Sequence, residues 1–131
     1  PHHFVSQKII QGALSIKRGE SDTLVLGDLS AEIDWGYAPD FVKAMYLIMQ
    51  LDKPDDFIIA TGQTHSVRDF VVTVFSKLNL NWADHVKENK LILNGKRNKL
   101  YGDSTKLQKA TGWKPSVSFE KMIENMLTNI I

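Results

Sequence analysis

Few of the 131 residues are polar side chains that lie where two predicted elements meet, which is where binding sites tend to form. Asp28, Asp34 and Tyr37 are the clearest group, because they fall at the joints between short apolar pieces within residues 24–44. Binding residues concentrate at such joints, where a loop held by a rigid scaffold can present side chains to a ligand. This stretch is therefore where we look first for a binding site.

Signatures of catalysis are missing from the sequence. The glycines are isolated, so no Gly-rich phosphate loop is present, and neither a Ser-His-Asp order nor a Gly-x-Ser-x-Gly elbow occurs. His2 and His3 are adjacent, and adjacent side chains diverge at the start of a helix, so a metal site is not expected. Taken alone, His65 is typical of a hydrogen-bonded surface residue, Trp35 of core packing and Lys8 of a solvated charge.

Charge and composition narrow the class of protein further. A formal net charge of +1 gives no electrostatic footprint for nucleic acid. Cysteine is absent, which removes disulfides and thiol catalysis and fits a cytoplasmic protein. No run approaches the roughly 20 apolar residues that span a bilayer, and no signal peptide pattern is present. We expect a single domain with no nucleic acid or membrane partner, and Pro1 as first residue suggests a piece of a longer chain.

The pattern of apolar residues predicts a mixed α/β chain with short strands and four to five helices. Helices are predicted over residues 4–18, 39–51, 67–78 and 103–111, with a last helix after residue 118. Extended pieces are predicted over residues 23–26, 33–36, 57–60 and 90–93, and the wholly apolar 57–60 is typical of a buried strand.

Several residues mark the ends of these elements. Gly19 and Gly112 are placed to end helices, and Pro39 suits the first turn of one. Ser66 followed by Asp69 resembles a capping box. Asn94 and Gly95 predict a turn. The apolar face of the second helix is expected to carry Phe41, Met45, Ile48 and Met49.

Six short pieces of the sequence carry a family pattern in order. The first three are Phe-Val-Ser-Gln-Lys-Ile at residues 4–9, Leu-Gly-Asp-Leu at 26–29 and Asp-Trp-Gly-Tyr-Ala at 34–38. The fourth is Asp-Phe-Ile-Ile-Ala-Thr-Gly at 56–62 together with His-Ser-Val-Arg-Asp-Phe at 65–70. The last two are Gly-Asp-Ser-Thr-Lys at 102–106 and Gly-Trp-Lys-Pro at 112–115. Together they resemble the C-terminal part of the GDP-mannose 4,6-dehydratases, nucleotide-sugar enzymes of the extended short-chain dehydrogenase/reductase group. The resemblance covers nearly the whole chain.

The resemblance implies a two-part protein of which residues 1–131 are the substrate-binding lobe. In that family an N-terminal Rossmann half binds NADP and carries the catalytic Thr, Glu and Tyr-x-x-x-Lys, and none of this is in the sequence. The implied function is binding GDP-mannose, or another nucleotide sugar, within an enzyme that forms GDP-4-keto-6-deoxy-mannose. The chain alone is expected to be inactive, without catalytic residues, a metal or a bound cofactor of its own, and a homo-oligomer is possible.

The resemblance also implies roles for individual residues. Lys8 matches a residue near the diphosphate, and a physical argument agrees, because the first turn of a helix offers free N–H groups to phosphate. His3 matches a cofactor-side position. The remaining positions implied to face the nucleotide are Val5, Ser6, Leu26, Gly27, Thr61, Gly62 and Gln63.

One departure from the family pattern leaves two readings open. The family has an Arg immediately before Asp-Trp-Gly, where this chain has Ile33, which cannot form the bidentate pair with phosphate. Arg97 is expected to supply the missing guanidinium. The alternative is a non-catalytic ligand-binding or assembly domain of the same fold, or the lobe of a related 4-keto-sugar reductase or epimerase.

Overall fold

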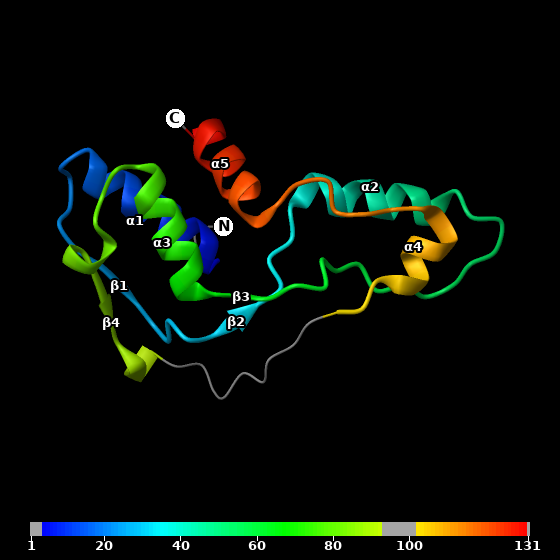
Figure 1. Ribbon diagram of the computed structural model, residues 1–131, viewed down its shortest axis with the longest axis horizontal. Helices are drawn as coiled ribbons and strands as arrows, with labels where there is room; N and C mark the ends of the chain where they lie inside the picture. The colour runs from blue at the N-terminus through cyan, green and yellow to red at the C-terminus, as the bar shows by residue number, and fades with distance from the viewer. Residues whose placement is uncertain (1–3, 93–101, 131) are drawn as a thin grey trace.

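The computed structural model describes residues 4–92 and 102–130, and these form two regions joined side by side (Figure 1). The elements in chain order are α1 (Val5–Lys17), β1 (Leu24–Leu26), β2 (Glu32–Ile33), α2 (Ala38–Met49), β3 (His65–Ser66), α3 (Val67–Lys77), η1 (Trp82–Asp84), β4 (Val86–Glu88), η2 (Lys90–Ile92), α4 (Thr105–Thr111) and α5 (Phe119–Ile130). This confirms the predicted mixed α/β class with short strands and several helices.

The larger part, here called the three-helix region, consists of α1, α3 and α5 with all four strands (Figure 1). Its helices meet through apolar faces that are completely buried, and α3 lies against both α1 and α5. Because close-packed apolar side chains supply most of the stability of a small domain, this region holds the main core. The largest of its fully buried side chains are Ile9, Ile10, Leu26, Phe70, Val71, Val74, Phe75 and Ile123.

The strands of the three-helix region form two sheets of two strands each. β1 pairs with β4 in parallel, with Leu24 opposite Val86. β2 pairs with β3 antiparallel, with Ile33 opposite His65. Leu24 and Leu26 are buried while Val25 between them is exposed, as the alternation of a strand requires.

The smaller part, here called the two-helix region, consists of α2, α4, residues 51–60 and Trp113. Its core is Ala44, Leu107 and Trp113, with partly buried apolar side chains around them. Trp113 meets the ring of Phe41 edge to face at 6.2 Å, and its indole N–H donates to the carbonyl of Asp40 over 2.9 Å. The chain passes between the two regions in the segments that precede α2, β3 and α5 (Figure 1).

Most predicted helix ends are confirmed. Gly19 follows Arg18, the C-cap of α1, and Gly112 is the C-cap of α4. Their φ angles are 74° and 73°, a conformation that glycine adopts without cost. Ser66 and Asp69 form the capping box of α3 in both directions, each at 3.0 Å. Ser118 accepts the backbone N–H of Lys121 at the start of α5.

Two predicted strands are wrong. Residues 90–93 were predicted to be extended, but 90–92 form a 3₁₀ turn, because the Asn89 side chain and carbonyl accept the N–H groups of Leu91 and Ile92. The strand of this stretch is β4, just before it. Residues 57–60 form no strand either, since no backbone partner within the described residues pairs with them. The turn expected at Asn94 and Gly95 lies outside the described residues.

The predicted apolar face of α2 is half wrong. Phe41 and Ile48 turn inward as expected, but Met45 and Met49 are exposed. The buried positions are instead Asp40 and Ala44. The helix is apolar on more than one side, so spacing alone could not identify the side that packs against α4 and Trp113.

Candidate functional site

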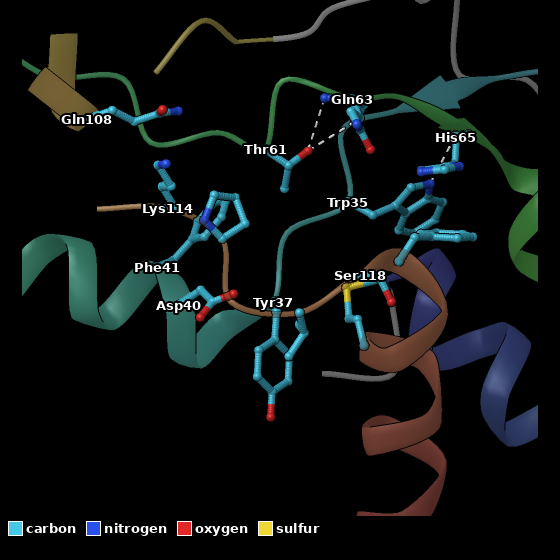
Figure 2. Close-up of a pocket in the computed structure, with 14 residues that line it drawn as sticks. Trp35, Tyr37, Asp40, Phe41, Thr61, Gln63, His65, Gln108, Lys114 and Ser118 are labelled. Carbon is cyan, nitrogen blue, oxygen red and sulfur yellow. Dashed lines mark hydrogen bonds between the residues drawn. The ribbon is translucent and has the colours of Figure 1, made fainter. Parts of the chain in front are cut away.

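The described residues enclose a cavity of about 300 Å³ where the two regions meet. Figure 2 shows Trp35 and His65 on one side of this cavity and Asp40, Phe41 and Lys114 on the other. It is open to solvent, and its wall combines flat aromatic rings with hydroxyl, amide and ammonium groups. The lining residues are Trp35, Tyr37, Asp40, Phe41, Thr61, Gln63, His65, Gln108, Lys114, Pro115, Val117, Ser118, Phe119 and Met122.

A carboxylate sets the turn that forms one edge of the cavity. Asp34 accepts hydrogen bonds from the Thr61 N–H at 3.2 Å, the Gly62 N–H at 3.1 Å and the Thr61 hydroxyl. Gly62 has a φ of 79°, which the turn requires and glycine tolerates. The Thr61 hydroxyl also accepts the Gln63 N–H at 3.2 Å (Figure 2). Thr61 and Gln63 are therefore held at the cavity by a partner 27 residues earlier in the chain.

Stacked rings form the wall on the side of the three-helix region. The Trp35 indole N–H donates to the His65 carbonyl at 3.0 Å, and the Trp35 ring lies 4.5 Å from the ring of Phe70. The His65 ring stacks on Phe119 at 3.9 Å with 10° between the planes. Trp35 is packed against the core as predicted, whereas His65 is a half-buried stacked ring in β3 instead of a hydrogen-bonded surface residue.

The opposite wall is fixed by a buried carboxylate. Asp40 accepts the Ser116 N–H at 2.8 Å and the Ser116 hydroxyl at 2.5 Å, so its charge is already satisfied by protein donors. The Gln108 side chain donates to Ser104 within α4 and its N-cap. A Cβ at Gly36 would lie 2.3 Å from the ring of Phe41, so a larger residue there would require this ring to move. The cavity thus suits stacking and hydrogen bonding, and shows no paired acid and base for proton transfer.

The sequence-predicted substrate residues fall in three places. Val5, Ser6 and Lys8 lie on the first turns of α1, where Val5 packs against the core and Lys8 is exposed. Leu26 is 1% exposed at the end of β1, so its side chain belongs to the core, and Gly27 follows it.

The third group is the turn of Thr61, Gly62 and Gln63. Thr61 and Gln63 line the cavity, whereas the residues on α1 and at the end of β1 do not. His3 and Arg97 lie outside the described residues. The structure therefore places three members of the predicted set together in one turn and leaves the other groups on α1 and β1.

The sequence reading missed most of the cavity wall. Phe41, Lys114 and Phe119 come from three distant segments, and only the fold brings them together. A signal was available for Tyr37, which was singled out at a joint between elements. No local pattern distinguishes Phe41 or Phe119 from ordinary core residues, because both lie on apolar helix stripes.

The loop after β1 carries one further ordered carboxylate. Asp28 accepts the N–H of Ser30 at 2.8 Å and its hydroxyl at 2.5 Å. These hydrogen bonds from Ser30, with the charge of Lys90 as a smaller influence, lower the pKa of Asp28 below its ordinary value. The loop beside Leu26 and Gly27 is thus ordered by its own side chains.

The described residues contain no cluster of glycines of the kind that holds a dinucleotide. Such a site needs clustered glycines between a strand and a helix, where the backbone approaches the pyrophosphate. Here the glycines with positive φ are Gly19, Gly62 and Gly112, and each stands alone in a turn or at a helix end. Over residues 4–92 and 102–130 no group of three metal-ligating side chains is assembled, and no helix of this part is long and apolar enough to cross a membrane.

Solved structures share this arrangement of helices and short strands. RMD from Pseudomonas aeruginosa, complexed with NADPH, matches 98% of this chain with a TM-score of 0.86 at 18% identity. The dTDP-glucose 4,6-dehydratase of Bacillus anthracis, in complex with NAD, matches 97% with a TM-score of 0.83 at 16% identity. This chain covers 43% and 39% of those two chains. The fold is that found in the extended short-chain dehydrogenase/reductase dehydratases and epimerases.

Sequence similarity is more specific than the fold. The family model described as GDP-mannose 4,6 dehydratase matches residues 1–126. The chain is 40% identical over 126 residues to GDP-mannose 4,6 dehydratase 1 of Arabidopsis thaliana and 36% identical over 143 residues to the human GDP-mannose 4,6 dehydratase. The chain belongs to the GDP-mannose 4,6 dehydratase family. It spans 35% and 38% of the length of these two relatives.

Proposed function

We propose that residues 1–131 are the nucleotide-sugar-binding domain of a GDP-mannose 4,6-dehydratase whose other part binds the cofactor. The observation that carries the proposal is the family match over residues 1–126. GDP-mannose is the expected substrate of the whole enzyme and GDP-4-keto-6-deoxy-mannose its product. A cytoplasmic location and a homo-oligomeric state accompany this proposal as predictions.

In this proposal the diphosphate lies at the first turn of α1. The N-cap residue Phe4 supplies no side-chain hydrogen bond to the helix, so among the described residues no N-cap side chain competes with an anion for the N–H groups of the first turn. Lys8 is exposed one turn further along and brings a positive charge. Val5, Ser6, the loop at Leu26 and Gly27, and the turn at residues 61–63 would surround the nucleotide.

The redox chemistry belongs to the part of the enzyme outside this chain. In such a dehydratase NADP supplies the acceptor and donor of hydride, and the described residues offer no site for it. The role of this chain is then to bind and orient the nucleotide sugar, because positioning the reactant lowers the barrier even where another domain carries the reacting groups. We expect the chain alone to form no 4-keto product from GDP-mannose and NADP.

One observation favours the second reading, a ligand-binding or assembly domain without catalysis. Ile33 stands where the family has Arg, and it lies in β2 opposite His65, partly buried against the core. No anion ligand is therefore available from this position. The two readings therefore differ in whether this domain binds the diphosphate of GDP through positively charged side chains.

The test is calorimetric titration of the 131-residue chain with GDP, GDP-mannose, UDP and dTDP. Lys8→Met is the informative variant, because a charge-assisted bond to phosphate of about 1.5–3 kcal/mol corresponds to a loss in affinity of roughly tenfold or more. Lys17→Met is the matched control, since Lys17 is an exposed lysine in the last turn of the same helix. Both variants are measured at two salt concentrations.

The proposal expects GDP to bind more tightly than UDP or dTDP, and Lys8→Met alone to weaken that binding. Equal affinity in both lysine variants would show that Lys8 is a solvated charge, as isolated surface lysines usually are. Absence of binding to every nucleotide by the folded chain would favour the non-catalytic reading.

A further inference from the structure

The cavity where the two regions meet has the size and the walls of a site for one small ring. Its volume of about 300 Å³ lies at the lower end of the range for small-molecule sites, which is about 300–1,000 Å³. A single ring with one substituent therefore fits it better than a whole nucleotide sugar. The lining combines aromatic rings with amide, hydroxyl and ammonium groups, which suits a ligand with flat apolar faces and a polar edge.

The rings of one wall are fixed in place by the protein itself. The Trp35 indole is held by its hydrogen bond to the His65 carbonyl, at 3.0 Å, and by the ring of Phe70. The His65 ring lies on Phe119, with 3.9 Å between the ring centroids. Trp35, His65 and Phe119 are only partly buried, so part of each ring stays accessible at the cavity. Rings that are already ordered lose little entropy when a ligand stacks on them.

Polar groups at the cavity keep hydrogen-bonding capacity that the protein does not use. The Gln63 side-chain amide and the Lys114 ammonium group have no partner within the described part of the chain. The Gln108 amide nitrogen donates to Ser104, which leaves the Gln108 oxygen as an acceptor. The Ser118 hydroxyl accepts a backbone N–H of α5 and still has a proton to donate. Such a mixed set of donors and acceptors matches ring hydroxyl groups, each of which both donates and accepts.

The charges at the cavity favour a ligand with a negative group. The two oxygens of Asp40 accept the Ser116 N–H and hydroxyl, so protein donors already compensate this buried carboxylate. Lys114 is exposed and lies on the side opposite Trp35 and His65 (Figure 2). A ligand that spans the cavity thus carries its ring and its negative group close together. A nucleobase is joined to its phosphate through a ribose and is too long for this arrangement, whereas a sugar can bear phosphate directly on its ring.

We propose that this cavity binds a glycosyl phosphate, which is a six-membered sugar ring with a phosphate on its anomeric carbon. The C–H groups of the ring lie on the faces of Trp35 and Phe119, because an aromatic face is slightly negative. The ring hydroxyls bond to Gln63 and Ser118, and the phosphate pairs with Lys114. A free sugar phosphate and the sugar end of a nucleotide sugar both contain this group. The inference rests on the cavity itself and does not require a nucleotide at α1.

The test is an NMR titration of the 131-residue chain, first shown to be folded by circular dichroism, with α-D-mannose 1-phosphate. The chain has three tryptophans, and their indole N–H signals report on the cavity at Trp35, on η1 at Trp82 and on the core of the two-helix region at Trp113. We expect saturable shifts of the Trp35 signal and of the amides of residues 61–63, with the Trp82 signal unchanged. Glycerol 3-phosphate, the matched ligand without a ring, is expected to bind about tenfold more weakly.

Two variants test the polar contacts. Lys114→Met removes the charge from an exposed side chain and should weaken mannose 1-phosphate about tenfold, since a charge-assisted bond to phosphate is lost. Gln63→Ala should weaken it about threefold, because a neutral hydrogen bond is lost while the contacts of the Gln63 backbone with Thr61 remain. Lys109→Met is the matched control, an exposed lysine on α4 that does not line the cavity. Circular dichroism checks that each variant is folded.

GDP-mannose and GDP separate the two sources of the sugar. If the sugar end of a nucleotide sugar is the ligand, GDP-mannose shifts the Trp35 signal and displaces mannose 1-phosphate, and GDP does neither. If a free sugar phosphate is the ligand, mannose 1-phosphate still binds in the presence of saturating GDP-mannose. Either result supports the cavity as a sugar site and identifies its source.

Four outcomes would overturn the proposal. The first is no saturable shift at Trp35 when mannose 1-phosphate is added to the folded chain. The second is equal affinity for glycerol 3-phosphate, and the third is equal weakening by Lys114→Met and Lys109→Met, since both would show general anion binding. The fourth is displacement of mannose 1-phosphate by GDP, which would assign the cavity to the nucleotide. The proposed function fails on a different observation, the absence of nucleotide binding to the chain, so the two can fail separately.

Discussion

The two regions of the molecule bury their apolar residues to very different extents. The three-helix region encloses Phe70 and Phe75 of α3 and Ile123 of α5 completely, and α3 packs against both α1 and α5. The two-helix region buries Ala44, Leu107 and Trp113, and within residues 4–92 and 102–130 one side of α2 stays exposed and no backbone pairs with residues 57–60. The first region holds the main core and the second a much smaller one.

Because the two-helix region has the smaller core, the hydrogen bonds that connect it to the three-helix region matter for its stability. Asp34 ties residues 61 and 62 to the segment before α2, and Asp40 ties the start of α2 to Ser116 before α5. Trp113 joins the same segment to α2. These polar contacts hold the weaker region beside the stronger one and shape the cavity between them, so stability and site geometry depend on the same few carboxylates.

The largest effect is expected from Phe70→Ala. Phe70 is fully buried, and its ring lies 4.5 Å from Trp35 and 5.9 Å from Phe119. Removing a buried Phe ring costs about 3–5 kcal/mol, a large share of the roughly 5–15 kcal/mol that stabilises a typical domain. Urea unfolding followed by circular dichroism measures the loss. Phe4→Ala is the control, at a Phe that is 65% exposed, and a similar loss there would show that burial is not the cause.

Trp113→Ala tests whether the regions differ in cooperativity. Trp113 is 3% exposed and joins α2 to the chain leaving α4. We expect α2 and α4 to lose amide protection while α3 keeps its own, because the three-helix core does not contain this ring. Hydrogen exchange of the variant measures both. Equal loss of protection in α3 would mean that the chain unfolds as one unit, against the comparison drawn above.

Asp34→Asn is expected to loosen the joint between the regions. The amide keeps the size of the side chain but removes the charge and one acceptor oxygen, and hydrogen bonds to charged groups contribute about 1.5–3 kcal/mol each. Faster exchange at residues 61–63 and a lower urea midpoint are the expected results. Asp28→Asn is the matched control, since among the contacts described the Asp28 carboxylate accepts hydrogen bonds from Ser30 alone, in its own loop. If both variants behaved alike, the joint would not depend on Asp34.

Local signals in the sequence predicted the helices well. Capping residues such as Ser66 and Ser118 and the terminal glycines act within one turn, so their effect is visible in a short window. The six sequence pieces identified the protein family, because they match the family residue by residue, whereas the spacing of apolar residues indicates only helices and strands. Thr61 and Gln63, which the resemblance implies to face the nucleotide, line the cavity, and their role in nucleotide binding stays a prediction.

The remaining errors share a physical cause. Residues 57–60 have the composition of a buried strand, but strand formation needs a partner, and none lies in the described chain. The inward side of α2 was misjudged because the helix is apolar on two sides, which a contact on each side would explain. The cavity wall could not be predicted, since Phe41, Lys114 and Phe119 meet only through the packing of the two regions.

The smallest effect is expected from Lys106→Met, which removes the exposed ion pair between Lys106 and Asp55 in the two-helix region. The Lys106 Nζ lies 2.9 Å from the Asp55 carboxylate, and its hydrogen bond is the main cause that lowers the pKa of Asp55 below its ordinary value. Because the pKa is lower in the folded chain, the pair stabilises the fold above the pKa of the unfolded chain and loses its effect as the pH falls through the folded one. The variant should therefore melt slightly lower than the parent at pH 7, and the difference should vanish in acid. Carbon-13 NMR should show the Asp55 pKa rising toward the ordinary value of an aspartate. Lys109→Met on the same helix should leave it unchanged, and a rise there too would show that general charge, rather than this contact, holds residues 55–57 against α4.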